Sequence, residues 1–199
     1  MNSDFYSALK ERHTCYVLGK SEEITDERIE EIITAVMENA PSSFNSQSER
    51  VVLLLGEQHA TLWNLTLETL RGVTPPEAFG ATEKKLAGLK DGMGTVLYFE
   101  DMDIVKGLQT NFPLYSENFP VWSDESSAML QFAIWVALSA EGLGASLHHY
   151  NPLIDDEIKS KSNLPASWRH TGQMPFGTIV EVPAPKEKAA PSEKLTVLK

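Results

Sequence analysis

The residues best suited to bind a small polar ligand lie in the stretch 41–48, which reads Pro-Ser-Ser-Phe-Asn-Ser-Gln-Ser. Its hydroxyls, side-chain amides and backbone N–H groups suit a ligand rich in carbonyls and ring nitrogens. Pro41 ends the preceding helix, and the apolar run 51–55 follows as a buried strand. We therefore expect a ligand-binding turn at the mouth of a strand. The composition also suits an ordinary loop after a helix, because serine, asparagine and proline favour turns.

A second candidate site begins at Arg12, after a short helix that we expect over residues 4–11 with Ser3 as its N-cap. Arg12, His13 and Thr14 place a guanidinium, a titratable ring and a hydroxyl side by side. These are the donor types that bind a phosphate. The alternative is a basic turn that stabilises the negative end of the helix dipole.

Other kinds of site are poorly supported by the residue spacing. His148 and His149 are adjacent on an expected strand, so their side chains point to opposite faces and cannot easily bind one metal ion. Cys15 is the only cysteine, which leaves neither an intrachain disulfide nor a zinc site. The Gly-Met-Gly at 92–94 precedes a strand, whereas a dinucleotide fingerprint follows one. A serine hydrolase is also disfavoured, because the sequence has no Gly-x-Ser-x-Gly elbow.

Composition and charge exclude several classes of partner. The 199 residues are 42% hydrophobic and 23% charged, which fits one globular domain with or without an arm. The net charge is −11, so we expect neither nucleic acid nor an anionic membrane as partner. The longest apolar stretch, 128–138, is too short to span a bilayer. With no secretory signal visible at the N-terminus, we expect a cytoplasmic protein.

Hydrophobic periodicity predicts a mixed α and β domain, with long apolar helices around a small sheet. The run 51–55 is apolar without alternation, so we expect it to be buried on both faces in the middle of the sheet. A helix after Ser123 is apolar on nearly all sides, which is typical of a core helix or an obligate interface. We expect helices from Thr25 to the Pro41 turn and over 57–71, 77–90, 104–109 and 124–141, and strands over 51–55, 95–99, 144–150 and 168–174.

Several connections carry specific expectations. Asp103 is expected to cap the helix 104–109, and Asn151 to cap a helix with Pro152 in its first position. The loop 111–122 is rich in aromatic residues and suits either a lid or packed connection. From residue 178 the chain becomes rich in proline and lysine before it ends on apolar residues, which indicates an extended arm that docks on another surface, for example that of a partner subunit.

Three motifs in this order resemble the FMN-dependent nitroreductase family. They are the stretch 12–16, the turn 41–47 and the Gly-Leu-Gly-Ala at 142–145. The Leu-His-His-Tyr-Asn-Pro at 147–152 is most similar to the fatty-acid-repression-mutant branch, which includes copper-induced bacterial nitroreductases. The resemblance implies a three-layer α+β sandwich with a central, mostly antiparallel sheet. It also implies a homodimer with its long core helix at the interface, an FMN-binding domain over 1–177 and an arm over 178–199 that packs on the dimer.

The resemblance also assigns the cofactor's phosphate site. Arg12 and Thr14 match the positions that hold the FMN phosphate, and His13 matches a second basic position. Tyr16 stands where the family often has arginine or lysine. The phosphate charge must then be balanced by Arg12 and a C-terminal base, for which Lys194 is the candidate.

The ring of the cofactor is assigned to two further segments. By the same resemblance, the turn lies along the isoalloxazine and crosses the dimer interface, and the segment 145–148 lies where family members give a backbone N–H to flavin N5. A Glu-Gly pair common there in the larger family is absent, so a preference for NADH or NADPH does not carry over. The residues assigned to the ring are Ser42, Ser43, Asn45, Gln47, Ala145, Ser146, Leu147 and His148.

The function implied is an FMN-dependent NAD(P)H oxidoreductase that reduces nitroaromatics or quinones by ping-pong hydride transfer through flavin N5. No catalytic side chain is then required, because the chemistry takes place on the flavin. The aromatic residues of 111–122 either line the substrate pocket or pack in the core. Two alternatives stay open: a flavin-binding regulatory or stress-response protein with incidental turnover, and an acidic dimeric scaffold without cofactor.

Overall fold

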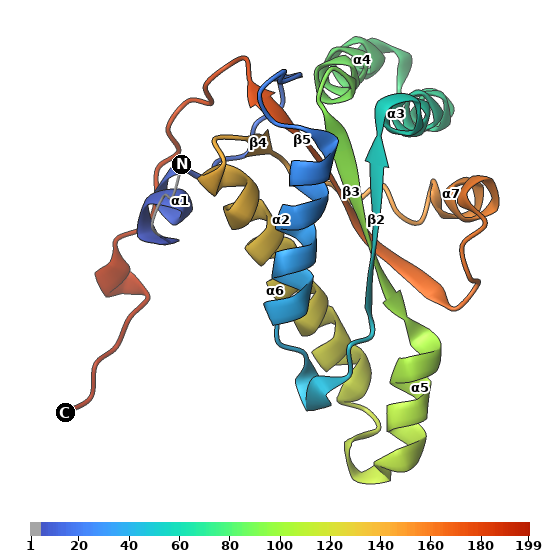
Figure 1. Cartoon of the computed structure of the whole chain (residues 1–199), viewed down its shortest axis with the longest axis vertical. Helices are drawn as coiled ribbons and strands as arrows, with labels where there is room; N and C mark the ends of the chain where they lie inside the picture. Colours follow the sequence, from blue (N-terminus) through green and yellow to red (C-terminus); the bar gives the residue numbers. More distant parts are fainter. Residues whose placement is uncertain (1–4) are drawn as a thin grey trace.

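The fold is built on one antiparallel sheet. The computed structural model of the chain describes residues 5–199, and within them five strands form a sheet of order β1-β5-β3-β2, with β4 also paired to β5 (Figure 1). The strands are β1 (Leu18–Gly19), β2 (Glu49–Leu55), β3 (Gly94–Asp101), β4 (Gly144–Ala145) and β5 (Trp168–Ile179).

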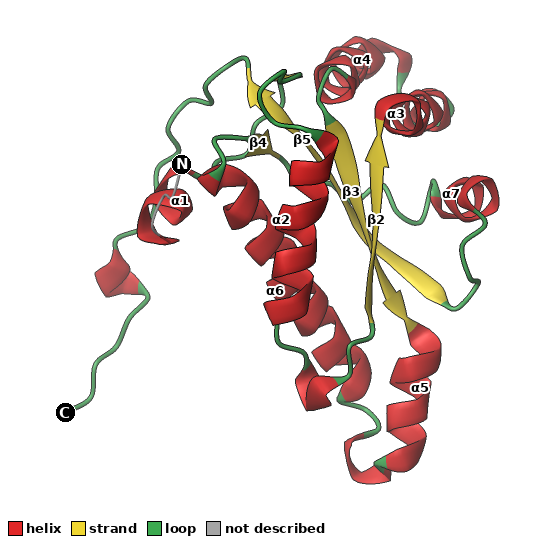
Figure 2. Ribbon diagram, viewed as in Figure 1, coloured by secondary structure: helices red, strands yellow, loops and turns green. Residues whose placement is uncertain are grey.

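Helices cover both faces of this sheet (Figure 2). They are α1 (Phe5–Glu11), α2 (Asp26–Asn39), α3 (Gly56–Arg71), α4 (Pro76–Lys90), α5 (Met102–Asn111), α6 (Phe119–Ala140) and α7 (Asp155–Ser162). Three short 3-10 turns are η1 (Ser43–Asn45), η2 (Pro113–Tyr115) and η3 (Pro191–Glu193).

The central strand β3 divides the core into two layers. Val96 and Tyr98 pack against residues of α2 and α6, whereas Leu97 and Phe99 pack against α3, α4 and α7. This follows from the two-residue period of a strand, which sends successive side chains to opposite faces. The predicted three-layer α+β sandwich with an antiparallel sheet is therefore confirmed.

The helix α6 runs beside α2 along one face of the sheet (Figure 1). Leu130, Ile134 and Leu138 are buried in the layer that α6 shares with α2. Met129 and Phe132 are exposed on the same helix, 42% and 43% respectively. A helix that buries one side and leaves large apolar residues on another is typical of an interface helix.

The prediction that residues 51–55 lie in the middle of the sheet is wrong. Among the described strands β2 pairs only with β3, so it is an edge strand, and its residues are half-buried. Its apolar composition has another cause. Val51, Leu53 and Leu55 pack on the α2–α6 layer, and Val52 and Leu54 pack on the α3–α4 layer. Helices on both faces demand apolar residues even from an edge strand.

The helix α2 begins where the sequence predicts, with Thr25 as its N-cap: Thr25 Oγ1 accepts a hydrogen bond from Arg28 N at 3.2 Å. The predicted cap of α5 is wrong by two residues: Asp101 caps it and accepts from Asp103 N. The predicted cap Ser3 lies outside the described residues.

Two other helices begin elsewhere than predicted. The helix α6 begins at Phe119 rather than 124, because Pro120 is tolerated in a first turn, where its missing N–H costs no hydrogen bond. The helix α7 begins at Asp155, not after Asn151. The side chain of Asn151 bonds to β5 instead, donating to His170 O and accepting from Gln173.

Strand lengths also differ from the sequence-based expectation. The strand β5 continues through Pro175 and Gly177 to Ile179, and the segment 144–150 is a strand only at 144–145, followed by a single bridge between His148 and Gln173. The short strand β1 was not predicted. Beyond β5 the arm is exposed, with η3 as its one short turn (Figure 1). None of the helices described over residues 5–199 combines the length and apolarity needed to cross a membrane.

Candidate functional site

The first and third sequence motifs meet in the structure. Residues Thr14 and Ala145 form a parallel bridge, and Cys15 N donates to Ala145 O at 3.0 Å. Ala145 also pairs with Phe176 of β5. The segment 12–16 therefore continues the sheet next to β4, which places Arg12 and Thr14 beside the segment 145–148.

Arg12 is held in a position suited to an anion. Its guanidinium lies over the ring of Trp135 on α6, 4.4 Å from the ring centre. Its Nε is buried and has no hydrogen-bond partner within residues 5–199. A buried unpaired donor is costly, and a charged one more so. A phosphate oxygen is the kind of acceptor that would pair with it.

The neighbouring residues of this motif are also available for binding. His13 is exposed and Thr14 is half-buried, and within the described part of the chain neither the ring nor the hydroxyl makes a hydrogen bond. Cys15, by contrast, is buried, and burial raises the pKa of its thiol. The backbone of the motif is thus fixed while two of its polar side chains remain free.

The segment 145–148 offers one free backbone donor. Ser146 N donates to Pro175 O at 3.2 Å, and His148 N donates to Gln173 O at 2.7 Å. Leu147, between them, points its N–H away from β5, and this group donates to no residue among those described. In an antiparallel pair, the N–H groups of successive residues point alternately towards the partner strand and away from it. This explains why Ser146 and His148 donate to β5 and Leu147 does not.

His148 is buried in an aromatic setting. Its Nε2 lies 2.8 Å from Ser146 Oγ, and its ring stacks on Tyr150 at 5.6 Å. Tyr16 and Trp63 are its other ring neighbours. Burial first, and then the charge of Lys85, lower the pKa of His148 to about 3. The ring is therefore neutral at physiological pH and contributes no charge to a phosphate site.

Lys85 is a candidate site residue that sequence reasoning missed. It lies on α4, and its Nζ is 5.4 Å from the Tyr16 ring centre and 5.7 Å from that of Tyr150. Burial lowers the pKa of its ammonium group. The ammonium group of Lys85 thus lies over the ring of Tyr16, the residue at the position where the resemblance leads one to expect arginine or lysine. The sequence contains no signal for this, because α4 has several lysines and a weak apolar stripe.

The turn 42–47 is built by its own polar groups. Gln47 N donates to Ser42 Oγ at 3.0 Å, and Ser43 N donates to Ser126 Oγ of α6 at 3.1 Å. Phe44, Asn45 and Gln47 have φ values of 57°, 50° and 48°. Left-handed backbone at three non-glycine residues is costly and is found mainly at functional sites.

Phe44 anchors this turn in an aromatic cluster. The cluster joins the turn to the segment that sequence analysis treated as an aromatic loop, with ring centres 5.2–5.9 Å from that of Phe44. Phe44 is 50% exposed, so the cluster is open to solvent on one side. Its other members are Phe112, Tyr115, Phe119 and Trp122.

The turn and the Arg12 motif lie at opposite ends of α6 (Figure 1). Ser126, near the start of the helix, bonds to the turn, whereas Ser139, near its end, donates to Ala8 O of α1 at 3.2 Å. Arg12 itself contacts Trp135, nine residues after Ser126, which corresponds to about 14 Å along the helix. In one chain the predicted ring contacts of the turn and the predicted phosphate contacts of Arg12 are therefore separated along α6.

Lys194, the predicted C-terminal base, lies in the exposed arm directly after η3. Its Nζ forms no ion pair within residues 5–199. Its assignment to the phosphate stays a prediction.

The sequence also did not predict a buried carboxyl group that lies next to the turn. Glu100 of β3 is fully buried, and its Oε2 accepts hydrogen bonds from Ser48 Oγ at 2.7 Å and Ser123 Oγ at 2.8 Å. Burial raises the pKa of Glu100 to about 7, against the smaller opposing effect of the two hydroxyls. The sequence placed this residue after an apolar strand, without a sign that its side chain points inward.

Comparison with known proteins agrees with this geometry. The sheet and its helices define an α+β sandwich of the nitroreductase type: the nitroreductase CinD from Lactococcus lactis, solved in complex with chloramphenicol, superposes with a TM-score of 0.90 at 38% identity and covers 98% of this chain and 100% of its own. The sequence model of the Nitroreductase family matches residues 9–178, and the chain belongs to this family.

Two further relatives extend the comparison. The protein HBN1 of Saccharomyces cerevisiae is 36% identical over 186 residues, which is 92% of this chain and 91% of HBN1. A nitroreductase from Desulfitobacterium hafniense with bound FMN has the same fold, with a TM-score of 0.74 and 16% identity over the full length of both chains. The predicted family is therefore confirmed.

The buried Glu100 makes a specific prediction for stability. Below its ordinary pKa of 4.5 the carboxyl is protonated in both folded and unfolded chains. As pH rises from there to about 7, the unfolded chain ionises first, so the stability that the protonated carboxyl provides is lost. We expect the wild type to lose roughly 2–3 kcal/mol relative to Glu100→Gln across this range. Urea unfolding of both proteins at pH 5, 6, 7 and 8 measures the difference.

The control is Glu38→Gln, an exposed carboxyl on α2, which should retain the pH dependence of the wild type. Stability curves of the wild type and Glu100→Gln that stay parallel from pH 5 to 8 would contradict a raised pKa at Glu100.

Proposed function

We propose that the protein is an FMN-dependent NAD(P)H oxidoreductase that reduces nitroaromatics or quinones. The observation that carries this proposal is that two unpaired donors lie on adjacent segments. Arg12 Nε is buried without a partner, the N–H of Leu147 is free, and the Thr14–Ala145 bridge joins their segments. One group suits a phosphate and the other suits a ring nitrogen. When bound, FMN accepts a hydride from NAD(P)H and passes it to the acceptor.

Residues of this chain have distinct roles in that site. Arg12 and Thr14 bind the phosphate, with His13 as a further donor from the exposed side. The N–H of Leu147 donates to flavin N5. Lys85, held over Tyr16, adds a cation that offsets negative charge on the cofactor. No side-chain acid or base is required for hydride transfer itself.

The proposal includes a homodimer, in which the turn 42–47 of one subunit completes the site of the other. It is supported by the separation of about 14 Å along α6 between Ser126, which contacts the turn, and Trp135, which contacts Arg12. Exposed Met129 and Phe132 on the same helix are suited to an isologous interface. We propose that the C-terminal arm packs on this dimer and that Lys194 reaches the phosphate.

The substrate class is supported by the solved complexes of the relative CinD. That protein is described with chloramphenicol and with 4-nitrophenol, and both complexes are 38% identical to this chain. The aromatic cluster around Phe44 offers apolar ring faces beside the turn, which suits flat aromatic acceptors. A free, buried Cys15 is compatible with a reducing compartment, and the proposal places the protein in the cytoplasm.

The first test is the visible absorption spectrum of the purified protein. We expect flavin absorption bands, or their appearance after reconstitution with FMN, and rapid bleaching by NADH or NADPH without oxygen. A protein that binds FMN but is barely reduced by either would support the flavin-binding regulatory function instead. A colourless protein that cannot be reconstituted would contradict FMN binding altogether.

Substitution of Arg12 by alanine should weaken the retention of FMN. A charge-assisted contact of about 1.5–3 kcal/mol corresponds to an affinity roughly 10- to 150-fold lower. Fluorescence titration of FMN into the apoprotein measures this change, and Lys10→Ala, an exposed residue of α1, is the matched control. Unchanged affinity in Arg12→Ala would remove this residue from the phosphate site.

The shared site can be tested by mixing subunits. Arg12→Ala and the double variant Asn45→Ala, Gln47→Ala should each be poorly active alone. If each site uses Arg12 from one subunit and the turn from the other, a mixed dimer has one intact site and one doubly defective site. Random exchange should then restore up to about one quarter of wild-type activity. No recovery after verified exchange would mean that each site is confined to one chain.

A further inference from the structure

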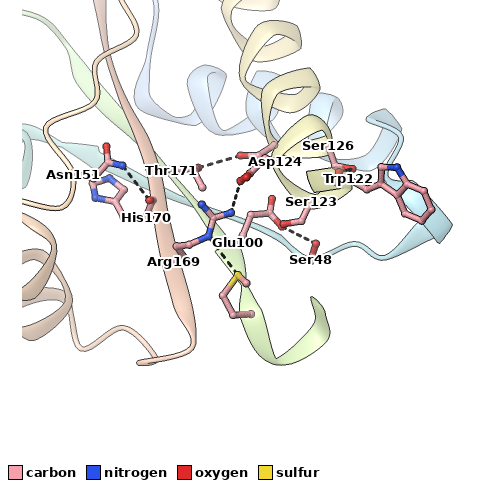
Figure 3. A network of polar contacts seen from close by, with 12 residues as sticks. Ser48, Glu100, Trp122, Ser123, Asp124, Ser126, Asn151, Arg169, His170 and Thr171 are labelled. Atoms are coloured by element: carbon pink, nitrogen blue, oxygen red, sulfur yellow. Dashed lines mark hydrogen bonds and ion pairs between the residues drawn. The ribbon is translucent and has the colours of Figure 1, made fainter. Parts of the chain in front are cut away.

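Glu100 is an unusual residue to find buried on the central strand β3, one residue before the strand ends. Its side chain is fully buried, and one oxygen, Oε2, accepts both available hydroxyl hydrogen bonds, from Ser48 and Ser123 (Figure 3). The other oxygen, Oε1, is buried without a hydrogen-bond partner in the described part of the chain. A carboxyl group with a purely structural role would use both oxygens, because each unpaired buried acceptor costs stability.

A polar path leads from this carboxyl group to the turn. Ser48 Oγ lies 3.3 Å from Ser46 Oγ, and Ser46 belongs to the turn between Asn45 and Gln47. Ser43, Ser46, Ser48 and Ser123 line a cavity of about 10 Å³, which is close to the space needed by one water molecule. Hydroxyl groups in such a chain can both accept and donate, so they can pass a proton.

The charged groups around Glu100 determine when it carries a proton. Glu49 faces it from β2 and Arg169 from β5, where both are its register partners. On α6, Asp124 pairs with Arg169 and so competes for its charge. Burial raises the pKa of Glu100 to about 7, Glu49 adds to this effect, and Arg169 opposes it. Glu100 therefore holds a proton in part of the molecules at neutral pH and can also release it.

We propose that Glu100 is the internal proton donor for reduction of the acceptor, and that Ser48 and Ser46 carry its proton to the turn. This inference depends on the proposed function, since it requires an acceptor bound beside the turn. It assigns a role in the reaction to Glu100, Ser48 and Ser46. These differ from the residues of the turn that are assigned to the flavin ring.

The step balances for a quinone acceptor. Reduction of a quinone to a hydroquinone takes up two electrons and two protons. Hydride transfer delivers two electrons and one proton, so a second proton must reach a carbonyl oxygen. In the protonated state the O–H on Glu100 Oε2 donates to Ser48 Oγ, and Ser48 donates to Ser46. The Glu100 O–H bond breaks as its proton passes to Ser48 Oγ, the hydroxyl proton of Ser48 passes to Ser46, and that of Ser46 passes to the acceptor. The Glu100 carboxylate then takes up a proton from solvent.

Two serines provide a matched pair for the test. Ser48→Ala and Ser123→Ala each remove one hydroxyl from the same oxygen of Glu100, but only Ser48 connects it to the turn. A structural role for these hydroxyls predicts similar effects of the two changes. Proton delivery predicts that only Ser48→Ala interrupts the reaction.

The experiment uses the FMN-loaded protein, reduced by NADH or NADPH and mixed without oxygen with 1,4-benzoquinone in a stopped-flow instrument between pH 5.5 and 8.5. The wild-type oxidation rate should fall as pH rises through about 7. Glu100→Gln, Ser48→Ala and Ser46→Ala should be at least about 10-fold slower at pH 6 and lose this pH dependence. Ser123→Ala should keep a pH-dependent rate.

A second measurement does not depend on the flavin. The infrared C=O band of a protonated carboxyl group should titrate near pH 7 in the wild-type apoprotein and in Ser48→Ala, and should be absent from Glu100→Gln. This separates loss of the acid from loss of the path, and it shows that Ser48→Ala still folds around a protonated Glu100.

The outcomes distinguish this inference from the proposed function. If FMN binds and is reduced normally but Glu100→Gln keeps the wild-type rate and pH profile, the proton donor is wrong and the oxidoreductase stands. Equal effects of Ser48→Ala and Ser123→Ala would overturn the path. A wild-type protein that binds no FMN would overturn both proposals.

Discussion

The packing of α6 against the sheet is the constraint on which the candidate site depends. Ile134 and Leu138 are buried in the core cluster that α6 shares with β3 and β5, and close packing of this kind fixes the helix against the strands. Its first turns hold the 42–47 turn through Ser126, and its later turns hold Arg12 through Trp135. A straight helix of 22 residues thus sets the distance between the two halves of the site.

This geometry gives the proposed dimer a chemical reason as well as a structural one. In a single chain, Arg12 contacts the later turns of α6, and the turn rich in amides and hydroxyls lies near the first turns. Arg12 is the cation that suits a phosphate. The length of α6 cannot change without loss of core contacts. The proposal therefore uses a second chain to bring the turn next to the Arg12 motif. Exposed apolar residues such as Phe132, midway along the same helix, provide a surface for this association.

Burial has different consequences for the polar residues near the site. The ring of His148 stays neutral, because desolvation disfavours its charged form. The guanidinium of Arg12 keeps a buried, unpaired N–H, which suits an anion. The carboxyl of Glu100 is shifted to a pKa of about 7. Burial thus leaves a neutral ring at His148, an unpaired donor at Arg12 and a raised pKa at Glu100.

The sequence by itself determined the layers of the fold and the candidate ligand motifs. Apolar periodicity located α2, α3 and α4 to within a residue or two at most ends, and the residue types of 12–14 and 42–47 indicated the two candidate binding segments. These features are local, because they depend on spacing along one helix, strand or turn. The family resemblance rested on the same local motifs.

Only the tertiary structure decided which residues face each other. It placed β2 at the sheet edge, since its apolar residues reflect helices on both faces and not strands on both sides. It brought Lys85 over Tyr16 and turned Glu100 inward toward Ser48 and Ser123. These contacts join residues far apart in the chain, and they depend on strand order and helix packing, which periodicity does not encode.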